Sequence, residues 1–242
     1  MKTVAFITLG CKVNQYETNA MTQQFIEKGY KIVEHTEKAD IYIVNTCTVT
    51  NMSDRKSRQM IRRVKEINPE AILVAVGCYA QVAKEELEKI PEIDLILGTN
   101  EKKNIYNLVN ELVQDRNLIG KEEKNQKIDI TDVLHCEEYA EFGEVTFTEK
   151  TRAVIKVQDG CDRFCSYCII PFARGHIRSR NPENVVSEIT KIAKQGIKEM
   201  VITGIHLASY GRDFKDKDFK LIDLLEKINK IDGIKRIRLR FT

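Results

Sequence analysis

Short apolar runs alternate with longer amphipathic stretches over the first 115 residues of the chain. The run 72–76 is wholly apolar, which is typical of a strand buried on both faces of a parallel sheet. Met60, Val64 and Ile67 recur at the spacing of an apolar helix face. We expect strands at 3–9, 31–34, 41–45, 72–76 and 95–97, and helices at 15–28, 52–67, 83–90 and 103–114.

A second alternating series begins near residue 149, after a segment without regular pattern. We interpret 116–148, which includes the charged run 121–127, as a connector between domains. In the second series, Asn181 is a plausible N-cap, Pro182 a first helical residue and Gly196 a helix end. We expect strands at 152–158, 199–203 and 235–239, and helices at 182–195 and 221–231.

The two series predict an α/β protein of two domains. Residues 1–115 should form a flavodoxin-like parallel sheet with strand order 2-1-3-4-5, and 149–242 the first three βα units of an incomplete barrel. A complete (β/α)8 barrel takes about 250 residues, and three strands cannot close one. The last strand would keep an unpaired edge, so we expect a second domain truncated at residue 242.

Composition changes this picture little. The net charge is only +3, so a nucleic-acid partner has to be argued from local patches. No apolar run is long enough to span a membrane, and residues 1–7 are too short for a signal peptide. The odd count of seven cysteines favours metal ligation in a reducing cytoplasm over disulfides. We therefore expect a cytoplasmic protein without membrane contact.

Cys161, Cys165 and Cys168 stand in C-x3-C-x2-C spacing just after an expected strand. A cubane 4Fe–4S cluster normally takes one thiolate for each iron, so three cysteines leave one iron open to a small molecule. Two other interpretations remain. The cysteines could form a zinc site with a further ligand such as His176, although structural zinc usually takes paired arms, or they could be unrelated thiols.

A second set, Cys11, Cys47 and Cys78, is dispersed in sequence, but each cysteine follows an apolar strand. In the order 2-1-3-4-5 these strands are neighbours about 4.8 Å apart, and their carboxyl ends meet where α/β sheets bind ligands. The three cysteines could therefore share one cluster. Alternatively, each is a buried apolar thiol. Cys136 has no strand context, and we expect it to be a free thiol without a role.

These motifs carry a family resemblance. The stretch around Cys161 resembles the radical S-adenosylmethionine (SAM) signature, and the two cysteine sets in this order resemble the methylthiotransferase family of radical-SAM enzymes over essentially the whole chain. Residues 9–18, 45–51 and 203–211 look like the branch that acts on threonylcarbamoyladenosine in tRNA. Sister branches act on isopentenyladenosine in tRNA or on a ribosomal protein.

The resemblance implies a radical-SAM barrel, two 4Fe–4S clusters and two molecules of SAM. The cluster on Cys161, Cys165 and Cys168 would bind SAM and start radical chemistry. The other cluster, on Cys11, Cys47 and Cys78, would hold a sulfur that is methylated and delivered to C2 of the adenine. The implied partners are a tRNA anticodon stem-loop and an electron donor such as flavodoxin or ferredoxin.

Family members usually complete the barrel and carry a small RNA-binding domain after it. From this difference we expect poor turnover by the 242-residue chain alone. The alternative from another functional class is an inactive truncated metal-binding module.

Supporting residues follow the second barrel strand and the cysteine loop. Thr203, Gly204 and His206 lie where barrel enzymes place active-site loops, so we expect them to contact SAM, or else to form a simple glycine turn. Basic residues after the loop could bind the SAM carboxylate or tRNA phosphate, or form a solvated loop. They are Arg174, Arg178 and Arg180.

One further basic stripe lies on the helix expected at 52–67. It could bind phosphates along its length, or it could be an ordinary solvent-exposed face. The residues of the stripe are Arg55, Arg58, Arg62 and Lys65.

Overall fold

The computed structural model describes residues 1–119, 126–148, 151–216 and 218–241. The chain divides into two compact units. Unit 1 comprises Met1–Gly10 and Met21–Asp132, and unit 2 comprises Cys11–Ala20 and Val133–Thr242. The domain boundaries expected at 115 and 148 stay a prediction. Most of the charged run 121–127 lies outside the described residues, and none of the helices in the described ranges is long and apolar enough to cross a bilayer.

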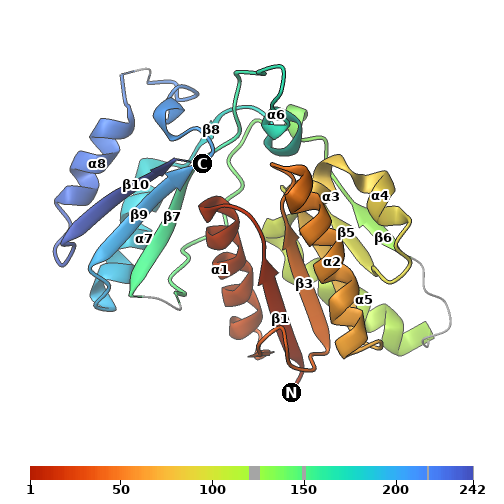
Figure 1. Cartoon of the computed structure of the whole chain (residues 1–242). Coiled ribbons are helices and arrows are strands. Elements are labelled where there is room, and N and C mark those ends of the chain that lie inside the picture. The colour runs from red at the N-terminus through yellow and green to blue at the C-terminus, as the bar shows by residue number, and fades with distance from the viewer. Residues whose placement is uncertain (120–125, 149–150, 217, 242) are drawn as a thin grey trace. The chain divides into compact units, whose positions relative to one another are not determined.

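Unit 1 is built on a parallel sheet that has six strands among the described residues, in the order β2-β1-β3-β4-β5-β6 (Figure 1). The expected order 2-1-3-4-5 is confirmed, and β6 extends the sheet with residues expected in the connector. The strands are β1 Thr3–Thr8, β2 Lys31–Ile32, β3 Ile41–Thr46, β4 Ile72–Gly77, β5 Leu95–Leu97 and β6 Lys127–Asp129.

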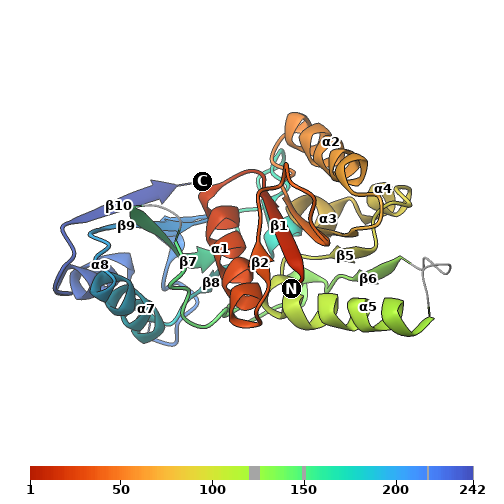
Figure 2. The same cartoon turned by 90° about the horizontal axis from the view of Figure 1, so that it is seen from below.

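Helices cover both faces of this sheet, with α2 on one face and α5 on the other (Figure 2). Ile61 and Val64 of α2 are fully buried in the same core as Tyr42 and Leu73 of the sheet. The helix expected at 83–90 is α4, Lys84–Glu88, and a further short helix that was not expected, α3, precedes it; Ala83 leaves the helical conformation between the two. The helices are α2 Asn51–Ile67, α3 Cys78–Val82, α4 Lys84–Glu88, η1 Glu101–Asn104 and α5 Ile105–Ile119.

Unit 2 has a sheet of order β10-β9-β7-β8, in which β7, β9 and β10 are parallel. These strands and their helices form the expected partial barrel, while the antiparallel β8 was not expected. Asn181 caps α7 by accepting a hydrogen bond from Glu183 N at 2.8 Å. The elements are η2 Val133–His135, β7 Arg152–Asp159, α6 Ile170–Arg174, β8 Arg178–Ser179, α7 Pro182–Lys194, β9 Glu199–Gly204, η3 Leu207–Ser209, α8 Leu221–Asn229 and β10 Arg236–Phe241.

Helix α1, Lys12–Glu27, contributes its first turns to unit 2. Tyr16 and Ala20 are buried there in a small apolar cluster with Val145. Phe142 packs edge-on against Tyr16, with ring centroids 6.3 Å apart. The segment that directly follows Cys11 is therefore part of the packing of the partial barrel.

Candidate active site

The three cysteines of the loop 160–169 follow the carboxyl end of β7, and we call this segment the cysteine loop. Gly160 begins it with φ +70°, and a Cβ at this position would lie 1.8 Å from His176 O. The amide of Cys161 donates to Gly175 O at 3.0 Å. The start of the loop therefore lies directly against the chain that follows α6, an approach that only glycine allows.

Within the loop, Phe164 adopts φ +42°, an unusual value for a residue with a side chain. Its ring packs edge-on against Phe172, at 5.9 Å between centroids. The amide of Cys168 donates to Cys165 O at 2.9 Å. These contacts give the loop a defined turn, with Cys165 exposed and Cys161 and Cys168 half-buried.

The donor set fits an iron–sulfur cluster. All three cysteines of the loop are thiols rather than disulfides, and soft thiolates are the usual ligands of such clusters. Within the described ranges no three His, Cys, Asp or Glu side chains gather closely enough to hold a single metal ion, and the zinc site with His176 stays an untested alternative. A cubane instead distributes its thiolates over different irons. His176 Nδ1 lies 2.8 Å from Asp162 Oδ1.

The end of β9 lies beside the end of β7, where Gly204 pairs with Gln158. Gln158, which the sequence analysis did not single out, bridges the two strand ends. It donates to Gly160 O at 2.7 Å and accepts from His206 N at 2.7 Å. Thr203 is buried and donates to Arg240 O at 3.1 Å. The structure therefore brings Thr203, Gly204 and His206 to the same end of the sheet as the cysteine loop.

The imidazole of His206 hydrogen-bonds Ser209 through Nδ1. Partial burial lowers the pKa of His206 below its ordinary value, and the positive charges of Arg163 and Arg212 lower it further. The shift favours the neutral ring of His206 at the edge of the candidate site, and the neutral ring can donate or accept one hydrogen bond at Nε2.

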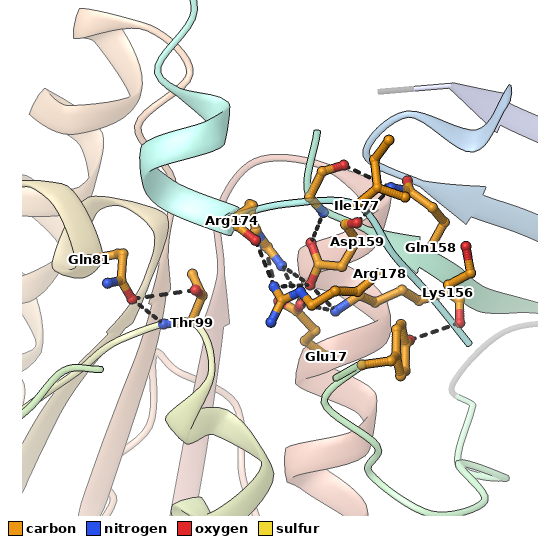
Figure 3. A network of polar contacts seen from close by, with 12 residues as sticks. Glu17, Gln81, Thr99, Lys156, Gln158, Asp159, Arg174, Ile177 and Arg178 are labelled. Carbon is orange, nitrogen blue, oxygen red and sulfur yellow. Dashed lines mark hydrogen bonds and ion pairs between the residues drawn. The ribbon is translucent and has the colours of Figure 1, made fainter. Parts of the chain in front are cut away.

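The three arginines after the loop are buried, so the solvated-loop interpretation is wrong. Arg174 is 0% exposed and donates to both carboxylate oxygens of Glu17 and to Asn14 Oδ1 (Figure 3). Lys156 donates to Glu17 Oε1 at 2.8 Å and to Asp159 Oδ2 at 2.5 Å. The SAM contact expected of Arg174 stays a prediction.

Asp159 stands two residues before Cys161 at the centre of this network. Burial alone would raise its pKa, but the positive charges of Lys156, Arg174 and Arg178 outweigh burial and hold the pKa below its usual value. We call the set Glu17, Lys156, Asp159, Arg174 and Arg178 the buried ion network. It holds the chain on both sides of the cysteine loop, through Asp159 and Arg174.

Arg178 and Arg180 have different surroundings. Arg178 donates from Nη2 to Arg174 O at 2.6 Å, while its buried Nε and Nη1 have no hydrogen-bond partner among the described residues. Arg180 is fully paired: it donates to Glu141, to Tyr16 Oη and to Glu188 Oε2. Arg178 is thus the arginine of the three that retains donors for a further group.

A cavity of about 530 Å³ within unit 2 lies between the first turns of α1 and the strands β7, β9 and β10. Lys12 and Gln15 line it from α1, and Arg152, Arg238 and Arg240 from the strands. Glu199 partly balances these charges, since it accepts from Arg238 at 2.5 Å. The charged side chains that line this cavity are thus all cationic, and they lie beside the apolar Val154, Val201 and Leu239.

The second cysteine set was expected on three strand ends of one sheet. Thr46 pairs with Gly77 across β3 and β4, so Cys47 and Cys78 follow adjacent strand ends. Both are 3% exposed, which agrees with ligands and with buried thiols alike. Cys78 is the first residue of α3 rather than part of a loop. Cys11 follows β1 by three residues, and it is half-buried, as is Cys136.

The basic stripe on α2 was expected to include Lys65, and this was wrong. Lys65 is 9% exposed and faces the interior, where it donates to Ala71 O at 2.6 Å and pairs with Asp94 at 3.4 Å. Its long side chain reaches past the apolar face of the helix to polar groups beneath it. Arg55 and Arg62 are exposed as expected, and Arg58 is half-exposed.

Two family models match the chain in succession. Residues 3–98 match "Uncharacterized protein family UPF0004", and residues 155–241 match the "Radical SAM superfamily".

Solved structures show the same fold at low identity. The radical SAM methyltransferase TsrM from Kitasatospora setae aligns with a TM-score of 0.58 at 14% identity, over 94% of this chain and 51% of its own. The cobalamin-dependent radical enzyme OxsB aligns with a TM-score of 0.57 at 14% identity, over 100% of this chain and 38% of its own.

Curated relatives are more similar in sequence. Threonylcarbamoyladenosine tRNA methylthiotransferase MtaB is 42% identical in Bacillus subtilis, over 99% of this chain and 51% of the relative, and 42% identical in Aquifex aeolicus, over 98% and 55%. Ribosomal protein uS12 methylthiotransferase RimO from Desulfitobacterium hafniense is 36% identical, over 99% and 52%. The chain thus spans about half the length of these relatives. With both domain models in order and these relatives along its whole length, the chain belongs to the methylthiotransferase family of radical-SAM enzymes.

Proposed function

We propose that this chain is the catalytic part of a tRNA methylthiotransferase that converts N6-threonylcarbamoyladenosine next to the anticodon to its 2-methylthio derivative. The observation that carries the proposal is the 42% identity to the two MtaB relatives over nearly the whole chain. The cysteine motifs and their positions at strand ends support it. In this function two 4Fe–4S clusters and two molecules of SAM take part.

Cys161, Cys165 and Cys168 would hold the first cluster, and Cys11, Cys47 and Cys78 the second. When bound, the first cluster, with one open iron, would supply an electron to SAM and so start radical chemistry at a carbon that acid–base catalysis cannot activate. The residues of this chain position the reactants. Gln158 holds the end of β9 against the start of the cysteine loop.

SAM brings a carboxylate and an amino group, which need partners. Arg178 supports a SAM site near the loop, since its buried Nε and Nη1 are donors that a carboxylate would satisfy. Thr203, Gly204 and His206 are proposed as further SAM contacts. Arg174 is proposed to contact SAM by exchanging one of its bonds to Glu17 or Asn14. Neutral His206 could accept a hydrogen bond at Nε2 from the SAM amino group.

The substrate is proposed to be the anticodon stem-loop of tRNA, and the electron donor a flavodoxin or ferredoxin in the cytoplasm. The other candidate substrates are isopentenyladenosine in tRNA and a ribosomal protein, because relatives named for these activities are 31–36% identical. The two MtaB relatives at 42% identity exceed these values, which favours the threonylcarbamoyl substrate, while MtaB relatives at 36–37% overlap with them. A chain that only binds metal is the remaining alternative.

Nucleoside analysis tests the proposal directly. In a strain from which the gene is deleted, mass spectrometry of digested tRNA should show loss of 2-methylthio-N6-threonylcarbamoyladenosine and retention of its unmethylthiolated precursor. Re-expression should restore the product, and re-expression with Cys161→Ala should not. Loss of the isopentenyl product, or of a methylthio group on a ribosomal protein, would instead identify one of the sister activities.

A further inference from the structure

Helix α2 carries a concentration of positive charge that the fold does not explain. Between Arg55 and Arg63 the sequence RKSRQMIRR holds five basic residues and no acidic one. The net charge of the whole chain is +3, so the remainder of the chain carries a net −2. These two and a half turns of one helix thus carry more positive charge than the net charge of the whole chain.

These charges are exposed and mostly uncompensated. Arg55, Lys56, Arg62 and Arg63 are exposed and have no ion-pair or hydrogen-bond partner in the described part of the chain. Arg58 differs, because it pairs with Glu86 at 3.0 Å and donates to Tyr79 Oη at 2.5 Å. Four cations thus remain available to an external partner.

The arrangement works against the helix itself. Arg58 and Arg62 stand at i,i+4, where like charges destabilise a helix by a few tenths of a kcal/mol. Arg55 and Lys56 lie in the first half of α2, nearer the positive end of the helix dipole than the negative end that favours cations. Arg62 and Arg63, in the second half of α2 and near Glu66, are placed more favourably, so the charges of Arg55 and Lys56 are the ones that an external anion would offset.

A shallow groove runs along these side chains, with a volume of about 480 Å³. It is lined by Arg55, Arg58, Gln59, Arg62, Arg63 and Glu66, all from α2. No apolar side chain lines it, and Arg is the side chain whose planar fork matches phosphate oxygens in pairs. We call the set Arg55, Lys56, Arg62 and Arg63 the α2 cation row.

We propose that the α2 cation row binds the phosphate backbone of the RNA substrate. This proposal rests on the proposed function, and it adds a binding surface in unit 1. Arg55 and Arg63 are about 12 Å apart along the helix, a length that accommodates successive phosphates of one strand. The row has no aromatic side chain, so it would position the backbone and leave base recognition to other residues.

The same helix begins four residues after Cys47, a proposed cluster ligand. A backbone held along α2 would therefore run toward the reactive end of unit 1. Two other partners fit less well. An anionic membrane would gain from apolar insertion, but most of the apolar face of α2 is buried in the core, and only Met52 within α2 and Val49 before it are exposed apolar side chains near the row. An acidic electron donor would serve the SAM-binding cluster, whose cysteines follow β7, whereas α2 follows Cys47 of the other proposed cluster.

The test measures binding of a fluorescent RNA hairpin with a seven-nucleotide loop to the 242-residue chain without clusters. The test variant is R55Q/R62Q/R63Q, and its matched control is K38Q/K89Q/K103Q, three exposed lysines of the same unit with the same change in net charge. Thermal unfolding verifies that both variants fold. We expect the arginine variant to bind about tenfold or more weakly at low salt, with the slope of log K against log salt smaller by about 2–3, and the lysine variant to match the parent chain.

Equal effects of the two variants would overturn the proposal, because binding would then follow net charge alone. An unchanged RNA affinity in the arginine variant, together with a loss of binding to phosphatidylserine vesicles or to a flavodoxin, would also overturn it and identify the other partner. Since the assay needs no cluster, SAM or turnover, its result is independent of the nucleoside analysis that tests the proposed reaction.

Discussion

Single charged side chains in the buried ion network hold segments that are distant in sequence. Glu17 and Arg174 are separated by 157 positions, and both are at most 1% exposed. Sequence inspection could identify Arg174 as a basic residue near the cysteine loop, but not its partner, since nothing in a local pattern relates it to Glu17. The role of such a residue is set by burial, which is a property of the complete fold.

Glu17→Gln should destabilise the apo chain by about 3 kcal/mol or more, because the buried cations Lys156 and Arg174 would lose one of the two carboxylates that balance them and keep only Asp159. Urea unfolding measures this. The matched control is Glu27→Gln on the same helix, where the side chain is exposed and a change within about 0.5 kcal/mol is expected. Equal stability of the two variants would contradict a structural role for the network.

His206 gives a prediction about pH. Burial and the two nearby arginines lower its pKa, so NMR titration should find its midpoint below the ordinary value of about 6.5. The folded state then favours the neutral ring. The contribution of His206 to the unfolding free energy is complete above the pKa of the unfolded state. It is lost as pH falls from about 6.5 through the pKa of the folded state.

The variant Arg163→Gln removes one of the positive charges and should move the His206 midpoint part of the way back. The spectrum of His206→Gln assigns the resonance. A midpoint at or above about 6.5 in the parent chain would show that the ring is not held as the structure indicates.

Elements differ in how well local pattern predicts them. β3 and β4 are buried throughout and contain the apolar runs 41–44 and 72–76, and such runs identify central parallel strands from sequence alone. β8 has two residues, Arg178 and Ser179, and β6 consists of exposed residues, so neither has the periodicity of a strand. Both form because they lie beside an existing sheet edge, which is a tertiary cause.

The turn between β7 and the cysteine loop depends on Gly160. Gly160→Ala would place a methyl group against the carbonyl of His176, and relief requires the backbone to move. We expect a loss of about 3 kcal/mol or more in the unfolding free energy, together with reduced iron incorporation at the loop.

Gly143→Ala is the control for this substitution. Gly143 has a similar φ of +75° in the same unit, but a Cβ there would have nothing within 4 Å. Gly143→Ala should therefore lower the unfolding free energy only through backbone strain, by about 1 kcal/mol, and leave the iron content unchanged. If the two alanine variants were equally stable and took up equal iron, the close approach of Gly160 to His176 would be without importance.

At the scale of the whole molecule, the sequence predicts α1 as one helix following the first strand, but not that its first turns belong to unit 2. That assignment comes from contacts such as Tyr16 with Arg180 and Glu17 with Lys156, which join residues far apart in the chain. Cys11 directly precedes these turns. The place of Cys11 in unit 2 follows from tertiary packing. It could not be predicted from β1, the strand that precedes Cys11 in the sequence.

The number of clusters is the property on which the proposed chemistry depends. After anaerobic reconstitution the chain should bind about eight irons, from two cubanes, each held by three cysteines. Replacing Cys161, Cys165 and Cys168 by alanine should leave about four, and replacing Cys11, Cys47 and Cys78 should also leave about four. Cys136→Ala is the control and should keep about eight. Iron and sulfide analysis with electron paramagnetic resonance distinguishes these outcomes, because only chains that retain the cysteine loop should show a spectrum that changes on addition of SAM. If the variant that lacks Cys11, Cys47 and Cys78 kept as much iron as the parent chain, there would be no basis for a second cluster. The chain would then be a radical-SAM protein with a single cluster.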